Sequence, residues 1–150
     1  MIGAGQLARM THQAGISLGQ TLRVLAAAAD DPAAQVTPDV VLGSHTELAD
    51  LRRAAAGTTV VTFDHEHVPD ELLARLTADG VNLAPPAEAL RHAQDKLVMR
   101  RRLVELGAPV PRYLGVTDPA GLDAVAEFAG AGPTVVKAAR GGYDGRGVAM

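Results

Sequence analysis

The sequence has no cysteine and no tryptophan, and it has only two phenylalanines and two tyrosines in 150 residues. The absence of cysteine excludes disulfides, zinc–thiolate centres and thiol nucleophiles. It also fits a reducing compartment, so we expect a cytoplasmic protein. No apolar run approaches the roughly 20 residues of a membrane-spanning helix, and the start does not have the pattern of a signal peptide. The net charge is only −3. We therefore expect neither a membrane nor a nucleic-acid partner.

What the chain does contain is an alternation of short β-branched runs and amphipathic segments. This succession predicts an α/β fold with a parallel sheet covered by helices. The break at Pro85-Pro86 places a domain boundary near residues 85–93, between a first domain, 1–92, and a second, 93–150. The predicted strands are 21–28, 39–42, 58–63, 81–84, 113–116 and 134–138, and the predicted helices are 6–18, 47–56, 69–78, 86–92, 94–106 and 119–128.

Both ends of the sequence favour a fragment of a longer protein. Only Met1 and Ile2 precede the first glycine, although a glycine-rich turn normally follows a buried strand of about five residues. At the other end, residues 148–150 are typical of the first part of a strand that pairs back on 134–138. We expect the first strand and this hairpin to be truncated.

The first stretch that could bind a ligand is G-A-G-Q-L-A, residues 3–8. A glycine turn that leads into a helix exposes backbone N–H groups at the positive end of the helix dipole, which suits a phosphate. The pattern also matches the G-x-G-x-x-A dinucleotide fingerprint, but the acidic residues that could bind the ribose come only at Asp30 and Asp31, beyond the end of the predicted strand 21–28. This argues against NAD and leaves a smaller phosphate ligand, or a tight turn without a ligand, open.

The second stretch is T-F-D-H-E-H-V-P, residues 62–69, just after a predicted strand. In open parallel sheets, ligands bind at this end of the strands. Neighbouring residues of an extended chain point to opposite sides, so a metal cage is less plausible than a hydroxyl-rich ligand held by Glu66. A solvated loop whose charges have no function is the alternative.

The third stretch is T-V-V-K-A-A-R-G-G-Y-D-G-R-G-V, residues 134–148. Lys137 lies in a run that predicts a buried strand, where an unpaired ammonium is costly. Either a partner carboxylate or a bound phosphate would compensate the positive charge of Lys137. The glycine loop, residues 141–147, is neither a Walker loop nor a kinase glycine loop. By itself it could be a hairpin tip, but a strand lysine followed by such a loop favours a nucleotide phosphate site.

Lys137 followed by G-G-Y-D-G-R-G resembles the ATP-grasp fold and, more narrowly, the family of 5-(carboxyamino)imidazole ribonucleotide synthases. The opening G-A-G-Q-L-A-R-M resembles that family's G-x-G-Q-L-x-R-M, and Q-D-K-L resembles its Q-D-[RK]-L. T-F-D-H-E-H-V resembles T-F-E-x-E-H-V, with Asp64 in place of the usual glutamate. Val148 departs from the family, where glutamine is common. The implied fold is a Rossmann-like pre-ATP-grasp domain, 1–92, followed by the incomplete first part of an ATP-grasp domain, 93–150.

The resemblance implies an ATP-dependent carbon–nitrogen ligase of IMP biosynthesis. ATP would phosphorylate bicarbonate to carboxyphosphate, and 5-aminoimidazole ribonucleotide would take up the carboxyl group on its amine. Mg²⁺ would bridge the phosphates, through ligands expected outside this chain, so we assign no metal residue here. We expect the fragment to be inactive by itself. Homodimers are common in the family, and the sequence leaves the oligomeric state open.

The resemblance also implies roles for individual residues. Tyr143, Asp144 and Arg146 would be catalytic, with Tyr143 holding carboxyphosphate. The implied ATP contacts are Lys96, Lys137, Gly142, Tyr143, Asp144, Gly145, Arg146, Gly147 and Val148. The implied ribonucleotide contacts are Gly5, Gln6, Leu7, Glu66, Asp144 and Arg146. Two alternatives stay open: another ATP-grasp carboxylase or ribonucleotide ligase, and a non-catalytic NAD-binding module.

Overall fold

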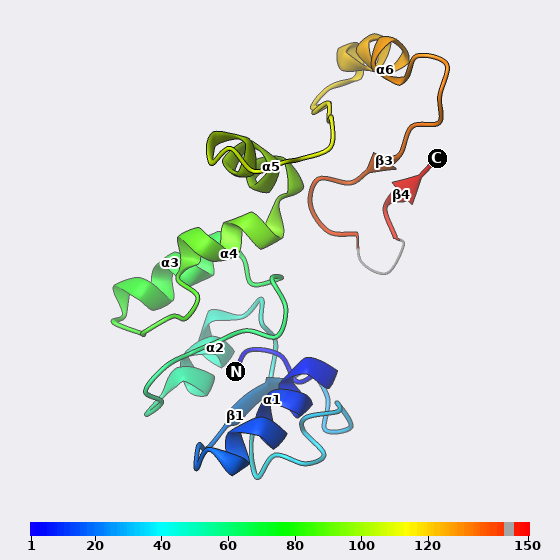
Figure 1. Cartoon of the computed structure of the whole chain (residues 1–150). Coiled ribbons are helices and arrows are strands. Elements are labelled where there is room, and N and C mark those ends of the chain that lie inside the picture. Colours follow the sequence, from blue (N-terminus) through cyan, green and yellow to red (C-terminus); the bar gives the residue numbers. More distant parts are fainter. Residues whose placement is uncertain (143–145) are drawn as a thin grey trace. The chain divides into compact units, whose positions relative to one another are not determined.

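A computed structural model describes residues 1–142 and 146–150 of the chain (Figure 1). These residues form two compact units, Met1–Arg91 and His92–Met150. No helix in the described part of the chain is both long enough and apolar enough to cross a membrane.

The first unit is built on a parallel sheet whose strands are very short. Strands β1 (Arg23–Ala26) and β2 (Asp39–Leu42) pair in parallel over four residues. Ile2 forms parallel bridges to Leu25 on one side and to Phe63 on the other, and Val61 bridges to Leu83. If the five segments are numbered along the chain, their order across the sheet is 3-2-1-4-5. This is the strand order of a Rossmann-like nucleotide-binding sheet.

Helices cover both faces of this sheet because successive residues of β1 point to opposite sides. Val24 and Ala26 pack in one buried cluster with Ala8 of helix α1 (Gln6–Ser17). Leu25 belongs to a second cluster, with residues from helices α2 (Leu48–Ala55), α3 (Asp70–Ala78) and α4 (Ala87–Gln94). Helix α1 therefore covers one face of the sheet, and α2 and α3 cover the other.

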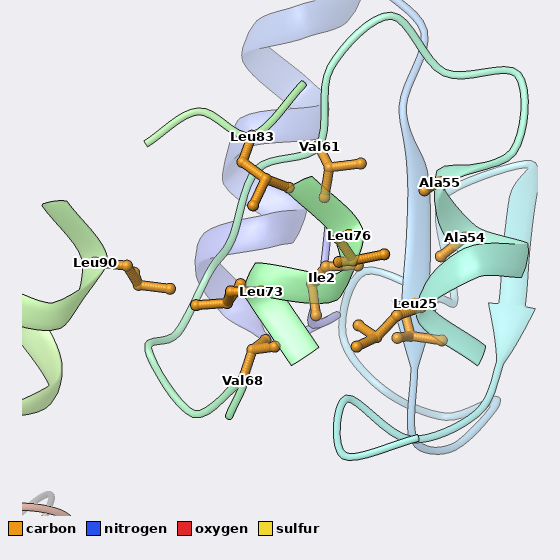
Figure 2. Packing of buried hydrophobic residues seen from close by; sticks show 11 residues of the cluster. Ile2, Leu25, Ala54, Ala55, Val61, Val68, Leu73, Leu76, Leu83 and Leu90 are labelled. Atoms are coloured by element: carbon orange, nitrogen blue, oxygen red, sulfur yellow. The ribbon is translucent and has the colours of Figure 1, made fainter. Parts of the chain in front are cut away.

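The second cluster is the main core of the first unit. Figure 2 shows Leu76 of α3 next to Ile2 of the sheet, whereas Leu73 extends on the side of α3 that faces Val68 and Leu90. These residues and Leu25 belong to one buried cluster. Leu73 and Leu76 are fully buried, and burying a leucine side chain stabilises a fold by roughly 1.5–3 kcal/mol. This packing holds the sheet edge at which Ile2 and Phe63 end, and that edge carries the first candidate site.

The second unit contains helices, one short hairpin and long irregular segments. Its helices are α5 (Lys96–Glu105), the 3₁₀ turn η1 (Pro119–Gly121) and α6 (Leu122–Ala129). Strands β3 (Val136–Lys137) and β4 (Val148–Ala149) pair antiparallel, with Lys137 opposite Val148. The prediction that the end of the chain pairs back on the lysine strand is therefore confirmed.

Several predicted strands are wrong or too long. The predicted strand 21–28 is shortened to β1, and 58–63 and 81–84 make only isolated bridges. Within the described residues, Phe63 pairs with Ile2 and Val61 pairs with Leu83 as single bridges, so no longer ladder forms. The segment 113–116 makes no strand, because no described segment pairs with it. The β-branched residues were recognised, but a strand needs a neighbour of matching length.

The prediction of a buried strand at 134–138 is also wrong. Val135 and Val136 are 51% and 56% exposed, and Lys137 is exposed as well. The reason is that β3 has one strand neighbour, and no described layer of residues buries its faces. The cost of burying an unpaired ammonium, which the sequence implied for Lys137, therefore does not arise here.

Candidate functional site

The first candidate site lies at the carboxyl edge of the parallel sheet. The turn 3–5 follows Ile2, and residues 64–67 follow Phe63, its neighbour in the sheet. These two segments flank the position at which the strand order reverses, between segments 1 and 4. In sheets of this kind, ligands bind in the crevice at that position.

Asp64 closes the turn that leads into α1. Its Oδ2 accepts a hydrogen bond from the backbone N–H of Gly5 at 2.8 Å, and its side chain is only 5% exposed. Gly3 adopts a φ of +99°, and a Cβ atom there would lie 1.6 Å from Asp64 Oδ1. Gly3 therefore cannot easily be replaced, because its positive φ is unfavourable for other residues and because a side chain would overlap the carboxylate of Asp64. An anion already lies at the N-terminus of α1, so a phosphate at Gly5 would meet a carboxylate.

Next to this turn is a cavity of about 230 Å³ lined mainly by backbone, Asp31 and two histidines. The rings of His45 and His65 meet edge to face, with centroids 4.7 Å apart. His65 Nδ1 accepts a hydrogen bond from the backbone N–H of His67 at 3.2 Å, which leaves the proton of a neutral ring on Nε2. Burial is the largest influence that lowers the pKa of both His45 and His65. Both imidazoles are therefore mainly neutral near pH 7. Among the residues that the structure describes, no lysine or arginine lines the cavity.

The predicted ribonucleotide contacts gather around this edge. Gly5 lines the cavity, and Gln6 and Leu7 lie exposed on the first turn of α1. Glu66 is half-buried in the segment that follows Phe63. His45 was not among the sequence predictions, although it follows β2, and the prediction that ligands bind past strand ends could have included it.

The second candidate site is a cavity of about 540 Å³ within the second unit. Lys96, in the first turn of α5, and Lys137, in β3, both line it. Among the described residues, no ion pair includes Lys137. The described residues therefore do not support the alternative in which a carboxylate of the same chain neutralises Lys137. Two lysine ammonium groups that line one cavity can bind a ligand with several negative charges.

Two arginines on the same cavity are held by aromatic rings. The guanidinium of Arg100 lies 5.8 Å from the ring centroid of Tyr113, and that of Arg112 lies 5.1 Å from the ring of Phe128. Such contacts are weakly stabilising at exposed positions. Arg100 is the first residue of the basic run 100–102 of α5, and the structure places it on the cavity.

The glycine loop begins and ends beside Lys137. The backbone N–H of Ala138 donates to the carbonyl of Gly147 at 2.8 Å, and Val148 pairs with Lys137. Gly142 has a φ of +77°, and a Cβ there would lie 2.7 Å from the carbonyl oxygen of Arg146. The predicted site residues Gly142 and Arg146 therefore face each other across the base of the loop. The predictions for Tyr143, Asp144 and Gly145 lie outside the described residues.

Metal ligands were not expected in this chain. Within residues 1–142 and 146–150, no group of three or more histidine, aspartate or glutamate side chains could hold a metal ion.

Comparison with known proteins identifies what this chain resembles. Residues 1–94 match the family model described as the ribonucleotide synthetase preATP-grasp domain. The N5-carboxyaminoimidazole ribonucleotide synthase of Mycobacterium tuberculosis is 69% identical over 150 residues, which are all of this chain and 35% of the relative. The enzyme of the same name from Corynebacterium ammoniagenes is 55% identical over 149 residues, 36% of its length. The chain thus spans about a third of the length of these curated relatives.

Solved structures of similar proteins cover both units. N5-carboxyaminoimidazole synthetase from Staphylococcus aureus, complexed with ADP, has a TM-score of 0.87 and 27% identity, over 98% of this chain and 40% of that one. The synthase from Aspergillus clavatus, in complex with ADP and 5-aminoimidazole ribonucleotide, has a TM-score of 0.79 and 30% identity, over 98% and 39%.

Proposed function

This chain belongs to the ribonucleotide synthetase preATP-grasp family, and on that premise we propose that it is part of an ATP-dependent ligase that carboxylates 5-aminoimidazole ribonucleotide. Bicarbonate would be activated as carboxyphosphate, and the products would be N5-carboxyaminoimidazole ribonucleotide, ADP and phosphate. The observation that carries the proposal is the convergence of Lys96 and Lys137 on one cavity at the base of the glycine loop. The names of the relatives, and the complex of one similar enzyme with ADP and 5-aminoimidazole ribonucleotide, support this choice of ribonucleotide and nucleotide.

We assign the two units different parts of this reaction. Residues 1–92 would be the pre-ATP-grasp domain, which binds the ribonucleotide, and residues 93–150 would begin the ATP-grasp domain, which binds ATP. Such an enzyme acts on small molecules in the cytoplasm. The remaining substrate and nucleotide contacts would come from the two thirds of the relatives that this chain does not cover.

In the nucleotide site, the lysines would act as point charges. Lys96 and Lys137 would neutralise phosphate oxygens and orient the chain of phosphates along the cavity wall. The loop residues Gly142, Gly147 and Val148 would approach the nucleotide through their backbone, which glycine permits most closely. Bound Mg²⁺ would supply further neutralisation of the phosphates, through ligands outside the described residues.

In the ribonucleotide site, Gly5, Gln6, Leu7 and Glu66 would contact the substrate. The carboxylate of Asp64 at the turn favours ribose hydroxyls over the 5′-phosphate at this place, because hydroxyls can donate to a carboxylate, whereas a phosphate dianion has no proton to donate and is repelled by it. Tyr143, Asp144 and Arg146 would complete the reaction site, with Tyr143 donating a hydrogen bond to carboxyphosphate. The same carboxylate opposes a dinucleotide pyrophosphate, so a NAD-binding module is disfavoured.

A binding experiment tests the nucleotide site. ADP is titrated into the chain and into Lys96→Met and Lys137→Met by calorimetry, and each substitution should weaken binding about tenfold or more, as expected for a lost charge-assisted contact. Arg101→Gln, an exposed change on α5, is the matched control and should leave the affinity unchanged. Equal affinity of all four proteins, or tighter binding of NAD than of ADP, would refute the assignment.

A further inference from the structure

The first turn of α5 is connected to the beginning of the glycine loop through Asp95. Its Oδ1 caps the helix by accepting the backbone N–H groups of Leu97 and Val98 at 2.8 and 3.1 Å. Its Oδ2 accepts the Nε–H of Arg140 at 3.1 Å. The two oxygens therefore make separate contacts. Oδ1 caps the helix that follows Asp95, whereas Oδ2 contacts Arg140, which is 45 residues away in the sequence.

Two further contacts connect the same two places. The backbone N–H of Lys96 donates to the carbonyl of Ala139 at 2.9 Å, and Lys96 Nζ donates to the carbonyl of Gly141 at 3.0 Å. Together with the ion pair of Arg140, three consecutive residues, 139–141, are held by Asp95 and Lys96. An ammonium has three N–H donors, so Lys96 still has two for a ligand.

These contacts involve both lysines of the cavity: Lys96 makes two of them, and the segment 139–141 begins two residues after Lys137. Arg140 comes three residues after Lys137, and the other end of the loop is fixed by the hydrogen bond between Ala138 and Gly147. The position of residues 139–141 against α5 thus sets how Lys137 and Lys96 stand relative to each other. Asp95 is 17% exposed in its side chain and Arg140 is 58% exposed, so solvent weakens the pair without removing it.

We propose that Asp95 is a positioning residue that, through Arg140, fixes the first arm of the glycine loop against α5 and so directs Lys96 and Lys137 to the same phosphates. The identity of the ligand rests on the proposed function, whereas the fixing of the arm does not. The simpler explanation is that Asp95 is only a helix cap. Asparagine caps helices about as well as aspartate, so Asp95→Asn keeps the cap, removes the charge that pairs with Arg140, and separates the two explanations.

Amide hydrogen exchange of the whole chain measures the arm directly. In Asp95→Asn, exchange at Lys96 and Ala138 should become about three- to tenfold faster, because a charge-assisted hydrogen bond becomes a neutral one. Exchange at Leu97 and Val98 should stay close to that of the wild type, because the cap remains. Asp118→Asn is the matched control, since Asp118 caps η1 through Gly121 at 3.2 Å and forms no ion pair among the described residues.

A double-mutant cycle shows whether the pair acts as a unit. Arg140→Met should speed exchange at Lys96 and Ala138 as Asp95→Asn does, and the double variant should add little to either single change. Additive effects, unchanged exchange in Asp95→Asn, or an equal effect of Asp118→Asn would overturn the proposal. In that case Asp95 is a cap alone.

Titration with ADP links the arm to the ligand. Asp95→Asn should weaken ADP binding about three- to tenfold while the melting temperature changes little. A wild-type chain that does not bind ADP would count against the proposed function, and the exchange experiment would still decide the role of Asp95. Wild-type affinity in Asp95→Asn, combined with faster exchange at Ala138, would show that the arm does not direct the lysines.

Discussion

At the scale of single residues, the most informative side chains are carboxylates that accept backbone N–H groups. Asp64 closes the turn before α1, Asp31 accepts the N–H groups of Ala27 and Ala28, and Asp95 caps α5. Each holds a loop next to a proposed site. These residues are therefore expected to matter through the backbone that they fix and not only through their charge.

His65 gives the stability of the first unit a dependence on pH. Its pKa is lowered, chiefly by burial, so the unfolded chain takes up a proton at a higher pH than the folded chain does. The contribution to stability is complete above the unfolded pKa of about 6.5 and is lost as the pH falls through the lower folded pKa. We expect His65→Asn to flatten the rise in unfolding free energy with increasing pH in the range below the unfolded pKa of about 6.5.

Urea denaturation at several pH values measures this slope. Asparagine can present an oxygen where His65 Nδ1 accepts the N–H of His67, so the local hydrogen bond has a replacement. His65→Gln, which also cannot ionise, is the control and should show the same flattened slope even if its overall stability differs. A slope in His65→Asn that equals that of the wild type would refute the assignment to this histidine.

At the scale of elements, the turn between Ile2 and α1 has little tolerance for a side chain. In Gly3→Ala, the Cβ would overlap Asp64 Oδ1 and the residue would have to keep a positive φ. The strained backbone and the displaced hydrogen bond to Gly5 should together cost about 3 kcal/mol of unfolding free energy. Native-state hydrogen exchange at Val24 and Leu25, measured over a range of urea concentrations, reads out this cost.

Gly57→Ala is the matched control for that change. Gly57 also has a positive φ, +72°, but among the described residues no atom beyond its two chain neighbours lies within 4 Å of an added Cβ. It should cost only the backbone part, about 1 kcal/mol. Equal losses for the two variants would show that Asp64 moves aside freely and does not define the turn.

At the scale of the whole molecule, the chain consists of two compact units with separate proposed ligands. A ligand that binds only the folded form stabilises it by about 2.7 kcal/mol at a hundred times its dissociation constant. ADP by itself should therefore slow amide exchange within residues 92–150, at Lys96 and Ala138, and leave Val24 and Leu25 unchanged. 5-Aminoimidazole ribonucleotide should slow exchange in the first unit, at Gly3 and Gly5.

Inorganic phosphate at the same concentration is the control for that experiment, and it should protect neither set of amides. Protection of the first unit by ADP would contradict the division of the two ligands between the units. So would a ribonucleotide that protects only residues 92–150.

The sequence by itself determined the features that depend on local physical chemistry. The period of apolar residues, with caps and glycine stops, placed α1, α2, α3 and α5 to within a few residues, and β2 matched its predicted range. The glycines at position 3 and in the glycine loop indicated both candidate sites from the sequence, and the structure gives positive φ angles to Gly3 and Gly142. The motif resemblance found the family because its four segments are read directly from the residues.

Only the tertiary structure decided which distant segments meet. The bond from Asp64 to Gly5 joins residues 59 apart, and the pair of Asp95 and Arg140 joins residues 45 apart. Likewise, the exposure of 134–138 and the isolated bridges at Val61 and Phe63 depend on the length of the neighbouring strand and on the layer above it. Local propensity indicates which segments can form a strand or a helix cap. Whether a segment does so depends on the partner that the packing of the whole unit places beside it.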